Sequence, residues 1–375
     1  MNDKHNFGFD TECKIIKPNG KVREIITDLY QPRVEGIVSV DTFGSDGMPK
    51  QHVEQPMRSF VKNFIYTHFI LGLRPSNESQ SLIKNTNNAA SLMASTGSTP
   101  VSINDTVITN PVSPNTQSQL GFIHQMPIYN SETQTVDLML RKEGQVNAGG
   151  SLREVGLHAR DNSFYYLVSR DLITPVSVKN GDMLRITITL RFPASTEKAM
   201  LNNFFLNLIQ LYAVNPFTIY KDISGANATS ILGSYVSSGL TYANYISIVN
   251  AGVVNKGIVV GSGNNNVDWE NDYALQTPIT SGSGAGQLVA NACTLAANST
   301  ALIVSGSSAL MEHWREFQNT STGNITVREA GVISEPQTTL FTPLKRFMLA
   351  RWLTGDVVVR PGETLRVSWR PKVTV

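Results

Sequence analysis

The sequence REVGL at residues 153–157 opens a stretch that runs from Ser151 to Phe192, and the chain contains this stretch twice. Near the C-terminus, REAGV occupies residues 328–332, and residues 351–372 align with residues 170–191 without a gap. An internal repeat has to be interpreted first, because each copy is one structural unit. The sequence therefore predicts a protein built from two copies of one β-rich module.

The end of each copy has the pattern of a strand. Apolar residues alternate with polar ones over residues 184–192 and again over 365–372, which is typical of a strand with one buried and one exposed face. A turn sequence precedes each strand, Asn180-Gly181 in one copy and Pro361-Gly362 in the other. Asn-Gly favours a type I′ turn and Pro-Gly a type II turn. A turn that persists while its residues change indicates a scaffold role.

The repeat extends into the loops. Residues 104–112 align with residues 271–279, and both segments begin with Asn-Asp. Before this point the copies differ, because the first reads STGST at 95–99 where the second reads VGSG at 260–263. The second copy also carries an insertion near 220–254, rich in Ser, Ala, Gly and Tyr, that is expected to form short strands and loops.

Apolar residues recur at helical spacing at the start of both copies, over 60–71 and 200–212. Such a stripe is typical of a helix that packs on a sheet, and Pro56 suits the first turn of the earlier helix. We therefore expect a mainly β fold of two tandem antiparallel β-sandwich-like domains, at 56–193 and 194–375, each preceded by one amphipathic helix.

Residues 1–55 are expected to form a separate N-terminal piece. Pro18-Asn19-Gly20 is a turn sequence between two short apolar runs and predicts a hairpin. The Gly- and Asp-containing segment 34–55 predicts an irregular extended arm, which packs on the first domain or reaches a neighbouring subunit.

Composition narrows the function classes. The 375 residues are 41% hydrophobic, 16% charged and carry a net charge of +2, which does not favour nucleic-acid binding. Cys13 and Cys293 lie far apart and fit a reducing cytoplasm rather than a disulfide framework. The polar N-terminus and the short apolar runs predict no signal peptide and no membrane span.

The most conspicuous candidates for chemistry are the duplicated Arg-Glu-x-Gly motifs and the arginines that follow them. Neighbouring strand residues point to opposite faces, so we interpret each glutamate as held by a cross-strand arginine that fixes strand register. The glycine of each motif suggests a bulge or a close backbone approach. The candidate register residues are Arg153, Glu154, Gly156, Arg170, Arg328, Glu329, Gly331 and Arg351. A plain surface ion pair and a catalytic glutamate are the alternatives, but the repeat marks no second acid of a glycosidase pair.

Other motifs carry weaker signals. Asp268, Glu270 and Asp272 could offer oxygen ligands to a cation, although an acidic surface turn is the simpler interpretation. The segment EHWRE at 312–316 lacks the second histidine of a zinc helix. Tyr165, Tyr166, Trp314 and Trp352 could line a sugar-binding face, although aromatic residues of sheets are more often buried. We predict no catalytic residue, no cofactor and no metal.

The order of these motifs resembles that of a widespread type of tailed-bacteriophage virion protein, found among tail, baseplate and tail-fibre-like components. The resemblance covers most of residues 56–375, once per copy. It is carried by the VGSG turn, the Asn-Asp segment at 271–279, REAGV, Leu349-Ala350-Arg351 and the closing strand PGETLRVSW at 361–369.

The resemblance implies a non-enzymatic virion structural protein, made in the host cytoplasm, that assembles with itself and with other virion proteins. We expect a ring or another symmetric oligomer in the tail, the baseplate or the head–tail region, because duplicated modules and an extended arm suit multivalent contacts. The alternatives are a receptor- or glycan-binding fibre or adhesin protein, a head decoration protein, and a polysaccharide hydrolase, for which the sequence offers no convergent carboxylate pair.

Overall fold

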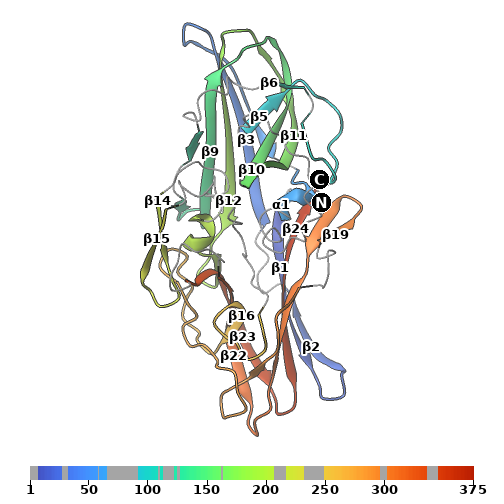
Figure 1. The fold of residues 1–375 in the computed structure, drawn as a ribbon, viewed down its shortest axis with the longest axis vertical. Coiled ribbons are helices and arrows are strands. Elements are labelled where there is room, and N and C mark those ends of the chain that lie inside the picture. The colour runs from blue at the N-terminus through green and yellow to red at the C-terminus, as the bar shows by residue number, and fades with distance from the viewer. Residues whose placement is uncertain are drawn as a thin grey trace.

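The computed structural model describes most of the chain, and the fold is elongated (Figure 1). The described residues are 7–27, 33–57, 59–65, 92–108, 110–112, 122–124, 127–161, 164–206, 217–231, 249–295, 302–335 and 345–375. The fold is mainly β, with 58% strand and 3% helical residues arranged in several antiparallel sheets. The expected fold class is therefore confirmed at this level.

The largest sheet has 14 strands and runs through the whole molecule in the order β17-β21-β24-β1-β3-β12-β9-β7, with six further strands paired at its margins. Its strands are β1 (Phe7–Ile16), β2 (Val22–Thr27), β3 (Arg33–Phe43), β4 (Pro49–Met57), β7 (Phe122–His124), β8 (Ile128–Asn130), β9 (Thr135–Gln145), β12 (Met183–Pro193), β17 (Val289–Ala290), β18 (Thr294–Leu295), β19 (Leu302–Ser305), β20 (Ser308–Met311), β21 (His313–Gln318) and β24 (Thr364–Thr374).

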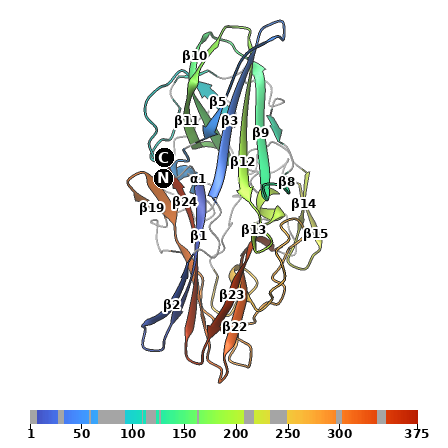
Figure 2. The same ribbon diagram turned by 180° about the vertical axis from the view of Figure 1, so that it is seen from behind.

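Two four-stranded sheets complete the fold, one toward each end of the molecule (Figures 1 and 2). The first consists of β11 (Phe164–Val178), β10 (Gly150–Asp161), β5 (Leu92–Ser95) and β6 (Pro111–Val112), in this order. The second consists of β13 (Lys198–Met200), β23 (Phe347–Val359), β22 (Ile325–Ser334) and β16 (Gly257–Gly261). A separate hairpin joins β14 (Phe217–Lys221) to β15 (Asn227–Ile231), at the start of the expected insertion.

The strands that the sequence repeats are equivalent in the structure. The REVGL motif lies in β10 and the REAGV motif in β22, and each pairs with the long strand that follows it, β11 or β23. The alternating segments form β12 and β24, whose inward apolar side chains are buried. This alternation was the clearest strand signal in the sequence, and the structure confirms it.

The N-terminal residues do not form an arm. Residues 34–55 lie in the hairpin of β3 and β4 rather than in an irregular segment, and Pro56 belongs to β4 rather than to a helix. The preceding hairpin, β1 and β2, has its turn at Gly20 as expected. β1 pairs over its whole length with β24, whereas β3 pairs with β12. Each N-terminal hairpin therefore completes the strand set of a different repeat.

The two expected amphipathic helices are not confirmed. Helix α1 spans only Lys62–Ile65, and the equivalent helical residues of the second repeat are 202–206. Residues 60–61 and 200–201 of the expected helices are not helical, and residues 66–71 and 207–212 lie outside the described residues. The aromatic side chains at these positions do enter the core, since Phe192 contacts both Phe204 and Phe205 edge to face. No helix in the described part of the chain has the length and apolar character needed to cross a membrane.

Candidate functional site

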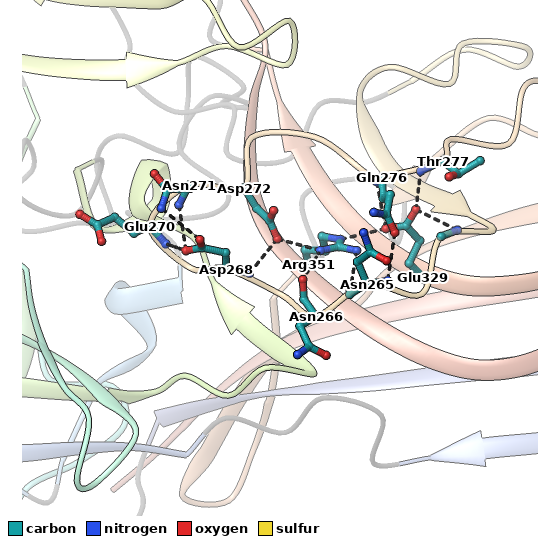
Figure 3. Close-up of polar contacts among 11 residues, drawn as sticks. Asn265, Asn266, Asp268, Glu270, Asn271, Asp272, Gln276, Thr277, Glu329 and Arg351 are labelled. Carbon is teal, nitrogen blue, oxygen red and sulfur yellow. Dashed lines mark hydrogen bonds and ion pairs between the residues drawn. The ribbon is translucent and has the colours of Figure 1, made fainter.

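The guanidinium of Arg351 lies at the centre of a buried polar cluster in the second repeat (Figure 3). Arg351 is on β23, opposite Gly331 of β22. Its Nε donates to Oε2 of Glu329 at 2.8 Å, and its Nη1 donates to Oδ2 of Asp272 at 2.7 Å. One arginine therefore joins a strand, its neighbour and the loop that covers them.

Backbone carbonyls of the same loop take the remaining bonds of this guanidinium. Nη1 donates to the carbonyl oxygen of Asn266 at 3.2 Å, and Nη2 donates to that of Asn265 at 3.0 Å. Charge-assisted bonds of this kind are roughly twice as strong as neutral ones. They fix the path of residues 265–272 over the sheet (Figure 3).

Glu329 is completely buried, and its carboxylate is fully engaged. Besides Arg351, its oxygens accept hydrogen bonds from the backbone N–H groups of Thr277 at 2.9 Å, Gln276 at 3.1 Å and Gly263 at 3.2 Å. A buried charge is tolerated only when it is paired and hydrogen-bonded. This carboxylate therefore holds two loop segments, before and after residue 270, against β22.

The first repeat contains an equivalent arrangement around Arg170. Nε of Arg170 donates to Glu154 and Nη1 to Asp105, while the carbonyl oxygens of Thr99 and Pro100 accept at 2.9 and 3.3 Å. Burial opposes the protonation of Arg170, but hydrogen bonds and charges from Glu154 and Asp105 outweigh it and raise its pKa. We call each set of one arginine and two acids an arginine clamp: Arg170, Glu154 and Asp105 in the first repeat, and Arg351, Glu329 and Asp272 in the second.

The clamps differ where Ser95 of β5 corresponds to Gly261 of β16. In the first clamp the Ser95 hydroxyl donates to Glu154 at 2.7 Å and accepts from the N–H of Gly97 at 2.9 Å. In the second clamp the N–H of Gly263 binds Glu329 directly. A Cβ at Gly261 would lie 2.5 Å from Oε1 of Glu329, so there is no room for a serine. In the first clamp the Ser95 hydroxyl therefore bridges the glycine N–H and the glutamate, whereas in the second clamp these two groups are bonded directly.

The arginine beside each glutamate does not join the clamp. The strand register shifts at Arg153 and at Arg328, where the opposite strands contain the extra residues, 173–175 in β11 and 354–356 in β23. Arg153 is exposed, and Arg328 forms an exposed ion pair with Asp356 at 2.8 Å. Each glutamate lies two residues before the glycine that pairs with its arginine, so the glutamate and the arginine share one face of the sheet.

The glycines of the two motifs lie where other chain segments approach closely. A Cβ at Gly331 would lie 2.7 Å from the carbonyl oxygen of Ala350, and one at Gly156 would lie 2.7 Å from a methyl carbon of Ile108. The structure thus brings six of the eight sequence candidates to the two clamps or beside them, and leaves Arg153 and Arg328 at the surface. The role of the set in fixing register stays a prediction.

A second ion pair, which was not predicted from the sequence, is duplicated as well. Nζ of Lys50 on β4 lies 2.6 Å from Oδ1 of Asp182, and Nε of Arg23 on β2 lies 2.8 Å from Oε1 of Glu363. The two acids follow the equivalent turns at Gly181 and Gly362, and each also accepts a bond from the backbone N–H three residues earlier. The side-chain bond from Lys50 to Asp182 lowers the pKa of that carboxyl. We call these pairs the hairpin locks.

The candidate cation ligands do not converge. Asp272 accepts from Arg351, while the Asp268 carboxylate accepts from the backbone N–H groups of Glu270 and Asn271, both at 3.1 Å. In the segments that the structure describes, no group of three or more His, Cys, Asp or Glu side chains has the geometry of a metal site. The segment EHWRE is not helical but belongs largely to β21.

The aromatic and cysteine candidates are buried or covered. Trp352 is fully buried, and Arg366 stacks over Trp314 at 4.3 Å from the ring centroid. The side chains of Tyr165 and Tyr166 lie outside the described residues. Cys293 lies 2.9 Å from Nε2 of His313, and burial raises the pKa of this thiol to about 11 and lowers that of the imidazole to about 3. Neither group is charged near neutral pH, so this pair is not an activated nucleophile.

Sequence reasoning overlooked the third member of each clamp. Asp105 and Asp272 occupy the same place in the aligned segments 104–112 and 271–279, so the repeat did mark them. They could have been found by asking which acids, like the two arginines, occupy the same aligned position in both copies. Comparison with known protein families, curated proteins and solved structures finds no match to this chain.

Proposed function

We propose that this chain is a non-enzymatic structural subunit of a tailed-bacteriophage virion, assembled into a ring or another symmetric oligomer in the tail, the baseplate or the head–tail region. One observation carries the non-enzymatic part. In both repeats the buried carboxylates that most resembled catalytic groups are bound to arginine, and each glutamate is completely buried. The place in a virion rests on the motif order described above.

The arginine clamps suit a structural scaffold. Each connects two adjacent strands to a covering loop through a guanidinium that carries four or more hydrogen bonds. An acid that worked in general acid–base catalysis would need access to substrate and a pKa matched to the reaction. A carboxylate enclosed by arginine and backbone N–H groups serves instead to hold loops in place, as contact surfaces of an assembly require.

The finer architecture belongs to the same proposal. We propose that the molecule consists of two tandem β-sandwich-like domains, each with a four-stranded sheet facing part of the 14-stranded sheet. The duplicated clamps and hairpin locks support this, because each repeat has one of each. Two similar domains in one chain present two related contact surfaces, which favours multivalent assembly with other copies and with other virion proteins.

The first test is the mass of the purified chain in solution. Light scattering on a sizing column and native mass spectrometry should show a closed oligomer of defined copy number that persists on dilution. Electron microscopy of the peak fraction should show rings or another symmetric particle. A monomer at all concentrations, together with absence of the chain from purified virions of its phage, would refute the proposal. Defined glycan binding by a monomer would instead favour the fibre or adhesin alternative.

A further inference from the structure

The N-terminal hairpin, residues 7–27, is a module whose attachments lie almost wholly with the second repeat. β1 pairs with β24 through ten successive residue pairs, from Phe7 opposite Val373 to Ile16 opposite Thr364. Arg23 adds the hairpin lock to Glu363 and donates from Nη2 to the carbonyl oxygen of Val358 at 2.6 Å. The hairpin therefore recognises β24 and its neighbouring turn.

The attachment of this hairpin to the first repeat is slight by comparison. In the β1–β3 pairing only Phe7 and Gly8 are matched, with Val34 and Arg33. The covalent connection between β2 and β3 is the five-residue segment 28–32. The second hairpin is different, because β3 and β4 dock on β12 of the repeat that directly follows them in the chain.

The two docking sites hold their hairpins through different ion pairs. The first repeat offers Asp182 to a lysine, and the second offers Glu363 to an arginine that forms a two-nitrogen contact. A hairpin that is held by a strand ladder and an ion pair, and is joined to the next strand by a short segment, makes the same contacts whether it docks on its own chain or on a second copy. Exchange of an identical element is thus a low-cost route to an oligomer.

We propose that hairpin 7–27 is exchanged between copies in the assembled oligomer, so that β1 of one chain pairs with β24 of the next. This inference rests on the proposed function and names the contact through which the assembly forms. The partner is a second copy of this chain, recognised by the same ladder and the same Arg23–Glu363 lock.

A cysteine pair across the β1–β24 ladder tests which chain supplies β1. Directly opposed residues of an antiparallel pair have Cα atoms about 4.5–5.5 Å apart, within reach of a disulfide. The variant Ile16→Cys/Thr364→Cys places both thiols in one full-length chain. The matched control is Phe43→Cys/Met183→Cys, the equivalent pair between β3 and β12. The natural cysteines are both buried and unpaired.

After mild oxidation, non-reducing electrophoresis should show covalently linked dimers and larger species for Ile16→Cys/Thr364→Cys, and single chains for the control. An oligomer in solution in which both variants yield only intrachain disulfides overturns the exchange and leaves the proposed function standing. A monomer with intrachain disulfides overturns the exchange, and it overturns the proposed function as well when the chain is absent from purified virions.

A charge reversal gives an independent readout that does not depend on disulfide formation. Arg23→Glu and Glu363→Arg each place two like charges at the lock. If the hairpin is exchanged, opposite charges face each other again at both locks when the two variants alternate in a mixed oligomer. Co-expressed chains carrying different tags should then be recovered in equal numbers, with a melting temperature close to that of the unaltered protein. Recovery of the melting temperature only when both substitutions are in one monomeric chain contradicts exchange.

Discussion

Arg351 lies opposite Gly331 in the β22–β23 ladder, yet its guanidinium reaches diagonally to Glu329, and Nε donates to Oε2 at 2.8 Å. Glu329 lies two residues from Gly331 and therefore on the same face of the sheet, and Glu154, Gly156 and Arg170 have the same relationship in the first repeat. Two copies that differ in most loop residues keep the same diagonal, the same acids and the same accepting carbonyls. The constraint that both copies satisfy is mechanical: one charged group determines the distance between a sheet and its covering loop.

Glu329→Ala should destabilise the protein strongly, because it leaves Arg351 buried with one of its two carboxylates missing. Removing one partner of a buried ion pair typically costs about 3–5 kcal/mol. Chemical denaturation measures the change, and Glu154→Ala should behave similarly in the first repeat. Asp356→Ala, which removes the exposed partner of Arg328, serves as the control and should cost under about 1 kcal/mol. Equal effects of the buried and exposed changes would argue against the clamp as a structural element.

Exchanging Ser95 and Gly261 between the two clamps should change the stability of the protein unequally. Gly261→Ser forces a Cβ to within 2.5 Å of Oε1 of Glu329 and 2.7 Å of the carbonyl oxygen of Thr277, and overpacking of this kind costs about 1–3 kcal/mol. Ser95→Gly loses the hydroxyl bridge at a cost of about 1 kcal/mol. Gly323→Ala, whose Cβ would meet nothing within 4 Å, is the control and should be close to neutral. Thermal melts rank the three variants, and a harmless Gly261→Ser would show that the loop moves freely.

The repeat itself was readable from the sequence because its signals are local. The alternation over 184–192 reports a strand whose inward residues fill a core, and β12 has that form. The turn chemistry was predicted less well. Gly181 and Gly362 both have positive φ, but Asn180 does not, so the expected type I′ turn at Asn180-Gly181 is wrong and the two copies keep similar turns. The backbone thus constrains the turn more than the Asn-Gly preference does.

Long-range pairing was beyond the reach of pattern arguments. The segment 34–55 is predicted to be an irregular arm because of its Gly and Asp residues, although Val34, Val38 and Val40 of β3 are buried. It forms a hairpin because β3 docks on β12, roughly 150 residues later in the chain, and β1 docks on β24 at the opposite end of the chain. Similarly, Arg351 and Asp272 meet only because the covering loop folds back over the sheet. The aligned Asn-Asp pairs showed that the acid is repeated, but they did not show which residue it contacts.

The protein should lose stability as the pH falls below neutrality because two histidines are buried uncharged. Burial, reinforced by the charge of Lys142, lowers the pKa of His158 to about 4, and burial with the charge of Arg315 lowers that of His313 to about 3. The unfolded chain protonates these groups near pH 6.5, so the stabilisation is complete above that pH and declines as the pH falls toward 4 and 3. Each of these two pKa shifts corresponds to about 3 kcal/mol or more of the free energy of unfolding.

His158→Leu should therefore flatten the pH dependence of the free energy of unfolding between pH 6.5 and 4. The control is His52→Leu, since His52 is exposed and pairs with Asp41 at the surface. Urea titrations at several pH values provide the comparison. An unchanged slope in His158→Leu would mean that the imidazole is already protonated in the folded protein.

Deleting residues 1–27 should prevent the second repeat from folding stably. The deletion removes β1 and β2, leaves the ten paired residues of β24 without their neighbour, and leaves Glu363 without Arg23. Trp369, fully buried on β24 opposite Thr11, should show red-shifted fluorescence and earlier thermal unfolding than in the intact chain. The double variant Val22→Ser/Ile25→Ser changes only half-exposed side chains of β2 and should melt within a few degrees of the unaltered protein. A truncated chain with native fluorescence and an unchanged melting temperature would show that β24 does not need this hairpin.

The truncation removes a structural strand, so loss of assembly in that variant alone would not locate a subunit contact. The cysteine pair across Ile16 and Thr364 leaves the strand in place and therefore does locate the contact.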